Sequence, residues 1–139
     1  MNQNDPRYAA YLRILAEELV PAMGCTEPIS ISFCAAKARG LLDTLPEAIT
    51  VAASGNIIKN VKSVVVPNTG GRKGIETAAA VGVVAGDPNR ELEVIASVTP
   101  EQREALGHYL ETTPIQVLPA DTDLVLDVTV TVQGGDHTA

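Results

Sequence analysis

The sequence predicts an α+β fold in which Ala- and Gly-rich buried helices pack with a mixed, largely antiparallel sheet. Apolar residues recur at helical spacing in some segments and alternate with polar residues in others, which indicates both kinds of element. Hydrophobic residues make up 45% of the chain, yet it has no Trp and one Phe, so the core must consist mainly of Ala, Val, Ile and Leu. A chain of 139 residues is also long enough to bury one core without disulfides or metals.

The predicted helices rest on periodicity and on end signals. After Pro6, apolar residues that include Leu12 and Leu15 recur on one side, which is typical of an amphipathic helix. The segment that starts at Thr26, the predicted N-cap, has small apolar residues on all sides, so we expect its helix to be largely buried. The predicted helices cover residues 6–20, 26–42, 75–85 and 100–111, and residues 57–66 are expected to begin as a helix and continue as extended chain.

The predicted strands cover residues 48–53, 92–98, 115–118 and 124–133. In the last of these, Leu124, Leu126 and Val128 begin an apolar series that alternates with polar residues. The strand runs into Gly134-Gly135-Asp136, a hairpin turn, and the sequence stops three residues later without an expected returning strand. We therefore expect residues 1–139 to be the N-terminal portion of a longer catalytic domain.

Composition narrows the classes of partner. The net charge is -7, with 17 acidic against 10 basic residues, which argues against a nucleic acid or an anionic membrane as partner. The sequence has no leader pattern and no apolar run near the ~20 residues of a membrane span, so a cytoplasmic protein is expected. A small molecule is the expected ligand, and the sequence leaves undecided whether the chain forms a homo-oligomer. Cys25 and Cys34 are nine positions apart, and if both belong to the helical region they cannot be neighbours on one turn, so we expect two free thiols.

Cys25 is the candidate reactive residue because it lies at the start of the predicted helix from Thr26. Free backbone N–H groups and the positive end of a helix favour a thiolate over a thiol, which makes such a cysteine a nucleophile, a base or a metal ligand. The alternative is that Cys25 is a small buried hydrophobe, as free cysteines often are.

Two further segments carry polar groups suited to a ligand. Ser54, Asn56, Lys59 and Asn60 follow the end of a predicted strand and suit a carboxylate or an amino acid, although an ordinary polar turn with a solvated lysine is the alternative. The loop 69–74 offers backbone N–H groups and two cations before a predicted helix, as an anion site would. Its spacing is not that of a P-loop, and a flexible loop is the alternative.

Five segments in this order resemble the L-cysteine desulfidase family, which is related to the alpha subunit of iron–sulfur L-serine dehydratases. They are G-C-T-E-P at 24–28, S-G-N-I-I-K-N at 54–60, V-P-N-T-G at 66–70, K-G-I-E at 73–76 and A-G-D-P at 85–88. The chain departs from the family pattern at Val61-Lys62-Ser63, where many relatives have a small residue and Met. This departure bears on which side chains shape the expected pocket, and not on the resemblance itself.

The resemblance implies a lyase that needs no PLP and performs α,β-elimination on L-cysteine or L-serine. The products would be pyruvate and ammonia, with sulfide from cysteine. A [4Fe-4S] cluster would act as Lewis acid on the leaving group, and its cysteine ligands would lie in the C-terminal part that is absent here, so this fragment alone is expected to be inactive. Carried onto this sequence, Cys25 would remove the α-proton or contact the cluster. Thr26 and Glu27 would shape the pocket, and the substrate carboxylate and amine would be held by Ser54, Asn56, Lys59, Asn60, Asn68, Thr69, Gly70 and Gly71.

Two other functions fit the same residues. In a PLP-dependent lyase, Lys59 would form the Schiff base and Gly70 to Gly74 would hold the cofactor phosphate. In a non-catalytic domain, the same polar segments would capture a small amino acid or carboxylate.

Overall fold

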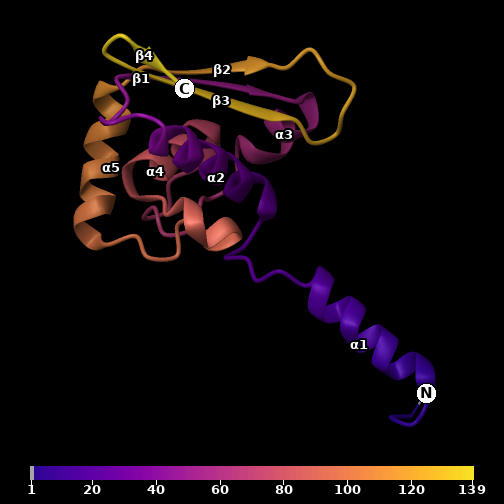
Figure 1. The fold of residues 1–139 in the computed structure, drawn as a ribbon. Coiled ribbons are helices and arrows are strands. Elements are labelled where there is room, and N and C mark those ends of the chain that lie inside the picture. Colours follow the sequence, from indigo (N-terminus) through magenta and orange to yellow (C-terminus); the bar gives the residue numbers. More distant parts are fainter. Residues whose placement is uncertain (1) are drawn as a thin grey trace.

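A computed structural model describes residues 2–139, and within them it confirms the predicted α+β class. One mixed sheet is covered on one face by helices (Figure 1). The helices are α1 (Pro6–Glu18), α2 (Thr26–Gly40), α3 (Gly55–Val61), α4 (Gly74–Ala85), the 3-10 helix η1 (Pro88–Glu93) and α5 (Pro100–Thr112). The strands are β1 (Ala48–Ala53), β2 (Ile115–Pro119), β3 (Val128–Gly134) and β4 (His137–Thr138).

The sheet has the order β2-β1-β3-β4, so β1 lies inside it although it comes first in the chain. β1 pairs in parallel with β2 and antiparallel with β3, and β3 pairs antiparallel with β4. Ile49, Val51 and Ala53 alternate into the core from β1, while Thr129 and Thr131 of β3 are exposed. Within residues 2–139 the helices thus cover one face of the sheet and leave the other open (Figure 1).

Helices α2 and α4 form the centre of the helical layer, and small residues let them approach closely. A Cβ added to Gly82 of α4 would lie 2.3 Å from the backbone oxygen of Ser32 in α2. The buried Ser32 hydroxyl also donates across the interface to the backbone oxygen of Ala78, at 2.7 Å. The predicted buried, Ala- and Gly-rich helices are therefore confirmed for this pair.

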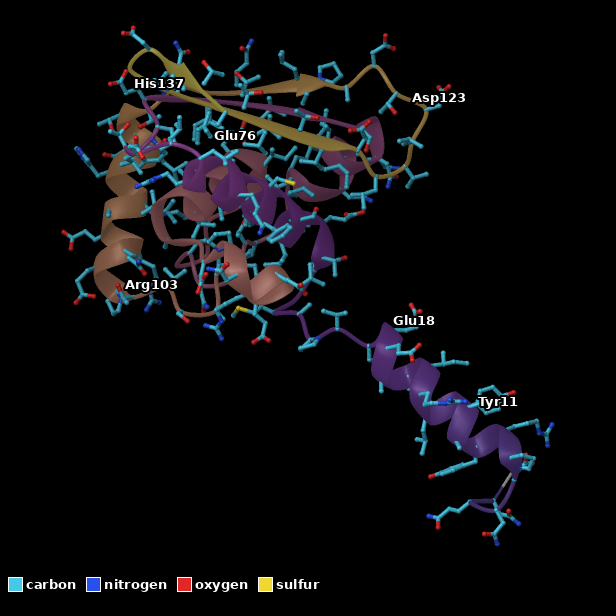
Figure 2. All side chains as sticks on the ribbon, viewed as in Figure 1. Tyr11, Glu18, Glu76, Arg103, Asp123 and His137 are labelled. Atoms are coloured by element: carbon cyan, nitrogen blue, oxygen red, sulfur yellow. The ribbon has the colours of Figure 1, made fainter. Side chains whose placement is uncertain are left out.

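Helix α1 forms where the sequence predicts it but lies away from the rest of the protein (Figure 1). The side chain of Asp5 caps it by accepting the N–H of Arg7 at 2.9 Å. None of the residues in Pro6–Glu18 is buried, and Tyr11 and Leu12 are about half exposed. Figure 2 shows Tyr11 and Glu18 at a distance from the sheet and from the other helices. The hydrophobic side of α1 is therefore exposed in residues 2–139.

Among residues 2–139, no helix combines the length and the apolar character that crossing a bilayer requires.

Two of the predicted strands are wrong in whole or in part. Residues 92–98 form the end of η1 and the turns after it, because Asp87 caps a helical start by accepting the N–H of Asn89 at 3.0 Å. Val94 and Ile95 are still buried, so their apolar character reflects the core and not a strand. Residues 124–127 form a loop, and the last long strand begins only at Val128.

The end of the chain also differs from the expectation. The turn at Gly134-Gly135-Asp136 is followed by a returning strand, the two-residue β4, which was not predicted. Gly135 has φ of 58°, a value that glycine adopts without steric cost in a tight hairpin turn. The hairpin therefore closes within the printed sequence.

Candidate functional site

The candidate site lies at the carboxyl end of β1, where the connection from β2 to β3 must cross because β1 lies between these two strands. This connection, residues 120–127, is tied to the junction of β1 and α3 at both of its ends. The N–H of Ala120 donates to the backbone oxygen of Ala53 at 2.8 Å, and the N–H of Ser54 donates to that of Asp127 at 2.9 Å. The loop is thereby held next to the start of α3.

Ser54 makes further bonds to the same loop with its side chain. Its buried hydroxyl donates to the backbone oxygen of Val125 at 2.8 Å and accepts the N–H of Asp127 at 3.4 Å. Ser54 occupies the N-cap position of α3, so the predicted polar turn 54–56 is in fact a helix start. A hydroxyl has a single hydrogen to donate, and that of Ser54 is used in the bond to Val125. It is therefore not free to bond a ligand.

A pocket of about 310 Å³ lies between this loop, the start of α2 and η1. Asn60 of α3 donates from Nδ2 to Oε1 of Glu27 at 3.1 Å, which ties the wall of the pocket to α3. The pocket is lined by Thr26, Glu27, Ser30, Leu92, Val125 and Leu126.

The sequence predicted part of this arrangement. Of the predicted site residues, Thr26 and Glu27 line the pocket, and Ser54 and Asn60 support its walls. Ser30 was missed, although its position one helical turn after Glu27 was a usable signal. The other missed lining residues are Leu92, Val125 and Leu126, which gave no such signal because both of their segments were predicted as strands.

Cys25 is exposed beside this pocket, so it is not a buried hydrophobe. It occupies the N-cap position of α2, and Thr26, the predicted N-cap, is instead the first helical residue. Gly24 has φ of 148°, and a Cβ added to it would lie 3.4 Å from Cγ of Pro67. The chain before Cys25 therefore runs against the loop between α3 and α4. Cys34 of α2 differs, because burial raises the pKa of its thiol.

The loop between α3 and α4 is closed by its own polar groups. Asn68, at φ of 58°, donates from Nδ2 to the backbone oxygen of Ile95 at 2.9 Å. The buried hydroxyl of Thr69 donates to the backbone oxygen of Val66 at 2.7 Å. These side-chain donors are thus used within the protein.

The remaining predicted residues lie on the surface. Asn56 and Lys59 are exposed on α3, and Gly70 and Gly71 are exposed in the loop after it. None of these four lines the 310 Å³ pocket described here within residues 2–139. Their role as ligands of a substrate stays a prediction.

The two cysteines of residues 2–139 lie far apart for ligands of one iron–sulfur cluster. Within residues 2–139, no three side chains of His, Cys, Asp or Glu are grouped so that they could hold a metal ion. Cys25 and Cys34 lie nine positions apart along α2, which corresponds to a rise of roughly 13 Å. The cysteine thiolates that bind a [4Fe-4S] cluster, about four in number, must all reach the same cluster. At most one of these thiols could contact any single cluster.

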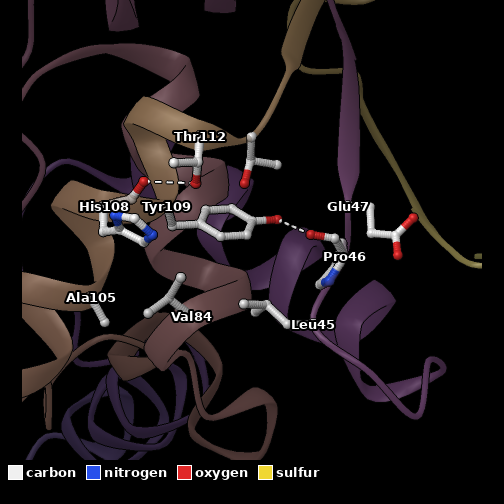
Figure 3. A pocket seen from close by; sticks show the side chains of 9 residues that line it. Leu45, Pro46, Glu47, Val84, Ala105, His108, Tyr109 and Thr112 are labelled. Atoms are coloured by element: carbon white, nitrogen blue, oxygen red, sulfur yellow. Dashed lines mark hydrogen bonds between the residues drawn. The ribbon is translucent and has the colours of Figure 1, made fainter.

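A larger cavity of about 500 Å³ lies elsewhere, between α5 and the connection from α2 to β1. Figure 3 shows Tyr109 at its centre, where the hydroxyl donates to the backbone oxygen of Pro46 at 2.7 Å. Burial raises the pKa of Tyr109 to about 12. Leu45 and Val84 give the cavity apolar walls, and none of the predicted site residues lines it. We therefore place the candidate site at the smaller pocket.

Comparisons with known proteins identify long bacterial relatives. No family model matches the sequence, and no solved structure matches it significantly. A UPF0597 protein of Desulfitobacterium hafniense is 51% identical over 131 residues, which cover 94% of this chain and 30% of that protein. A UPF0597 protein of Treponema denticola is 44% identical over 131 residues, covering 94% of this chain and 30% of that protein. In Finegoldia magna, a UPF0597 protein is 53% identical over 107 residues, which cover 77% of this chain and 26% of that protein. The chain thus spans about 30% of the length of the curated relatives that it matches, and it is similar to UPF0597 proteins over that part.

Proposed function

We propose that this chain is the N-terminal part of a lyase that performs α,β-elimination on L-cysteine or L-serine without PLP. The observation that carries the proposal is the exposed thiol of Cys25 at the N-terminus of helix α2, beside a pocket lined by Thr26 and Glu27. The resemblance of five segments to L-cysteine desulfidases supports it. The match covers only 30% of the relative from Desulfitobacterium hafniense, so the rest of such a protein, about 70% of its length, could supply the other part of the enzyme.

The reaction needs a base at the α-carbon and a group that accepts the departing sulfur or oxygen. The base takes the α-proton, and the Cβ–S or Cβ–O bond breaks with its electron pair leaving on the heteroatom. The resulting enamine becomes an imine, which water hydrolyses to pyruvate and ammonia. In our proposal Cys25, which is exposed at the N-terminus of α2, supplies the base.

Glu27 is suited to bind the substrate ammonium. Its Oε1 accepts from Asn60, which fixes the direction of the carboxylate, and its Oε2 can accept a charge-assisted hydrogen bond from the ammonium. The group that polarises the leaving atom is proposed to come from outside residues 1–139, where the resemblance implies a [4Fe-4S] cluster.

The test uses the full-length protein, purified without oxygen and supplied with iron and sulfide. We expect it to release pyruvate from L-cysteine or L-serine. In our proposal Cys25→Ala lowers the rate by about 10²- to 10⁴-fold, the usual contribution of a general base. Cys34→Ala, which removes the other thiol, is the matched control and should keep most of the activity.

The outcomes separate the alternatives. If Cys25→Ala retained the wild-type rate, Cys25 would lose its proposed role, and if neither amino acid gave pyruvate, the lyase proposal would fail. An absorption band that borohydride abolishes would instead indicate PLP bound to a lysine. Lys59, the candidate for that bond, is exposed on α3 and does not line the pocket.

A further inference from the structure

Three consecutive large apolar side chains are exposed in the loop between β2 and β3. Leu124, Val125 and Leu126, which we call the apolar knuckle, are 64%, 70% and 60% exposed. Three adjacent side chains of this kind are unusual on a surface that faces only water, and contiguous apolar surface marks sites of contact. The flanking Asp121 and Asp123 are exposed, and Figure 2 shows Asp123 at the outer end of this loop.

Hydrogen bonds within this chain hold the backbone of the apolar knuckle in place without a binding partner. Ser54 bonds the backbone of Val125 and Asp127 through its hydroxyl and its own N–H. The N–H of Leu124 donates to Oγ1 of Thr122 at 3.2 Å, and the N–H of Ala120 is tied to β1. A surface that is already ordered loses less conformational entropy when it is covered, which favours binding.

The apolar knuckle is also continuous with the candidate site. Val125 and Leu126 line the same pocket as Thr26 and Glu27, so a surface that covers the knuckle also closes this pocket. About 70% of the length of the curated relatives lies outside the region that matches this chain. The part of the protein that would complete the site is thus large enough to cover it.

We propose that the apolar knuckle is the docking surface for the remainder of the full-length polypeptide, which closes over the pocket beside Cys25. The covering surface is apolar at its centre and carries Lys or Arg at its rim, opposite Asp121 and Asp123. Ser54 acts as a positioning residue that presents the knuckle. The identity of the occupant rests on the proposed function, because it is the part that completes the site.

The accessibility of the apolar knuckle is tested in the full-length protein by thiol labelling. Leu124→Cys introduces a thiol at the knuckle, and Glu101→Cys introduces the control at an exposed position of α5. Maleimide labelling is followed peptide by peptide, in native protein and in urea. We expect position 124 to label at least about tenfold more slowly than position 101 in native protein, and both to label alike in urea. Equal native rates would overturn the proposal.

The occupant is identified by a photoreactive amino acid placed at position 124 of the full-length protein. A cross-link to a peptide from the same polypeptide, beyond the region of 139 residues, supports the proposal. A cross-link between two copies, seen as a doubled mass, would overturn it in favour of an interface between protomers.

A second variant links the apolar knuckle to Ser54. Ser54→Ala removes the hydroxyl that holds Val125 and Asp127, and we expect faster hydrogen exchange at the amide of Asp127. Ser63→Ala, an exposed serine after α3, is the matched control and should leave this exchange unchanged. These readouts do not depend on activity. A protein without lyase activity but with a covered knuckle would refute only the proposed function, and an active protein with an uncovered knuckle would refute only the docking.

Discussion

Replacing Gly82 by Ala should destabilise the protein, although the same change in an ordinary helix is stabilising. A Cβ at Gly82 would lie 2.3 Å from the backbone oxygen of Ser32 and 2.8 Å from Cβ of Ala35. The Ser32 oxygen belongs to the backbone and cannot rotate away, so α2 and α4 would have to separate by at least about 0.7 Å to bring this contact to 3.0 Å. Over-packing of this kind costs up to about 3 kcal/mol, and the helical preference of Ala returns about 1 kcal/mol.

Because the closest contact is with backbone, we take the upper end of this cost, and the net effect of Gly82→Ala is then a loss of about 2 kcal/mol, which lowers Tm by roughly 6 to 8 °C for a domain of this size. Urea unfolding and a thermal scan followed by circular dichroism measure both quantities. The matched control is Gly40→Ala at the end of α2, where an added Cβ meets no atom within 4 Å, and this variant should be as stable as the wild type or more so. A Gly82→Ala variant with unchanged or higher Tm would refute the close packing of α2 and α4.

Three other outcomes follow from particular side chains. In the 139-residue chain, iodoacetamide should alkylate the exposed Cys25 before Cys34, whose thiol pKa is raised by burial, and equal rates by peptide mass spectrometry would contradict this. Because burial raises the pKa of Tyr109 to about 12, above a value of about 10 in the unfolded chain, stability should fall as the pH rises from about 10 to about 12. Tyr109→Phe should show a smaller fall in urea titrations over that interval, and an identical fall would exclude Tyr109 as its source. Thr99→Ala removes the acceptor of the Gln102 N–H and should cost about 1 kcal/mol in urea unfolding, against almost nothing for Glu101→Ala.

Local sequence signals were enough for the elements whose ends and faces are set nearby. The helix predicted over 100–111 begins at Pro100, where Thr99 and Gln102 form a capping box, and β1 covers the predicted residues 48–53. The strand predicted at 92–98 failed because a local cap at Asp87 and burial in the core compete with strand pairing.

The candidate site could be predicted only in part, for a different physical reason. That Cys25, Thr26 and Glu27 lie together at the start of a helix could be predicted, because the end of a helix is a local feature. The role of Ser54 could not be found, because its hydroxyl bonds residues about 70 positions later in the chain. The alternation that predicted a strand through Leu126 reflects apolar side chains at the surface of a loop, which no local rule distinguishes from a strand.

The central position of β1 has a consequence for synthesis of the chain. β1 ends at Ala53, whereas its neighbours β2 and β3 begin only at Ile115 and Val128. During synthesis on the ribosome, both edges of β1 therefore stay unpaired until these later strands have been made. Pairing over such long separations is slow, and an unpaired apolar strand such as Ile49 to Val51 is open to aggregation during that time. Nascent chains halted before residue 115 should therefore depend more on chaperones than chains halted after residue 134.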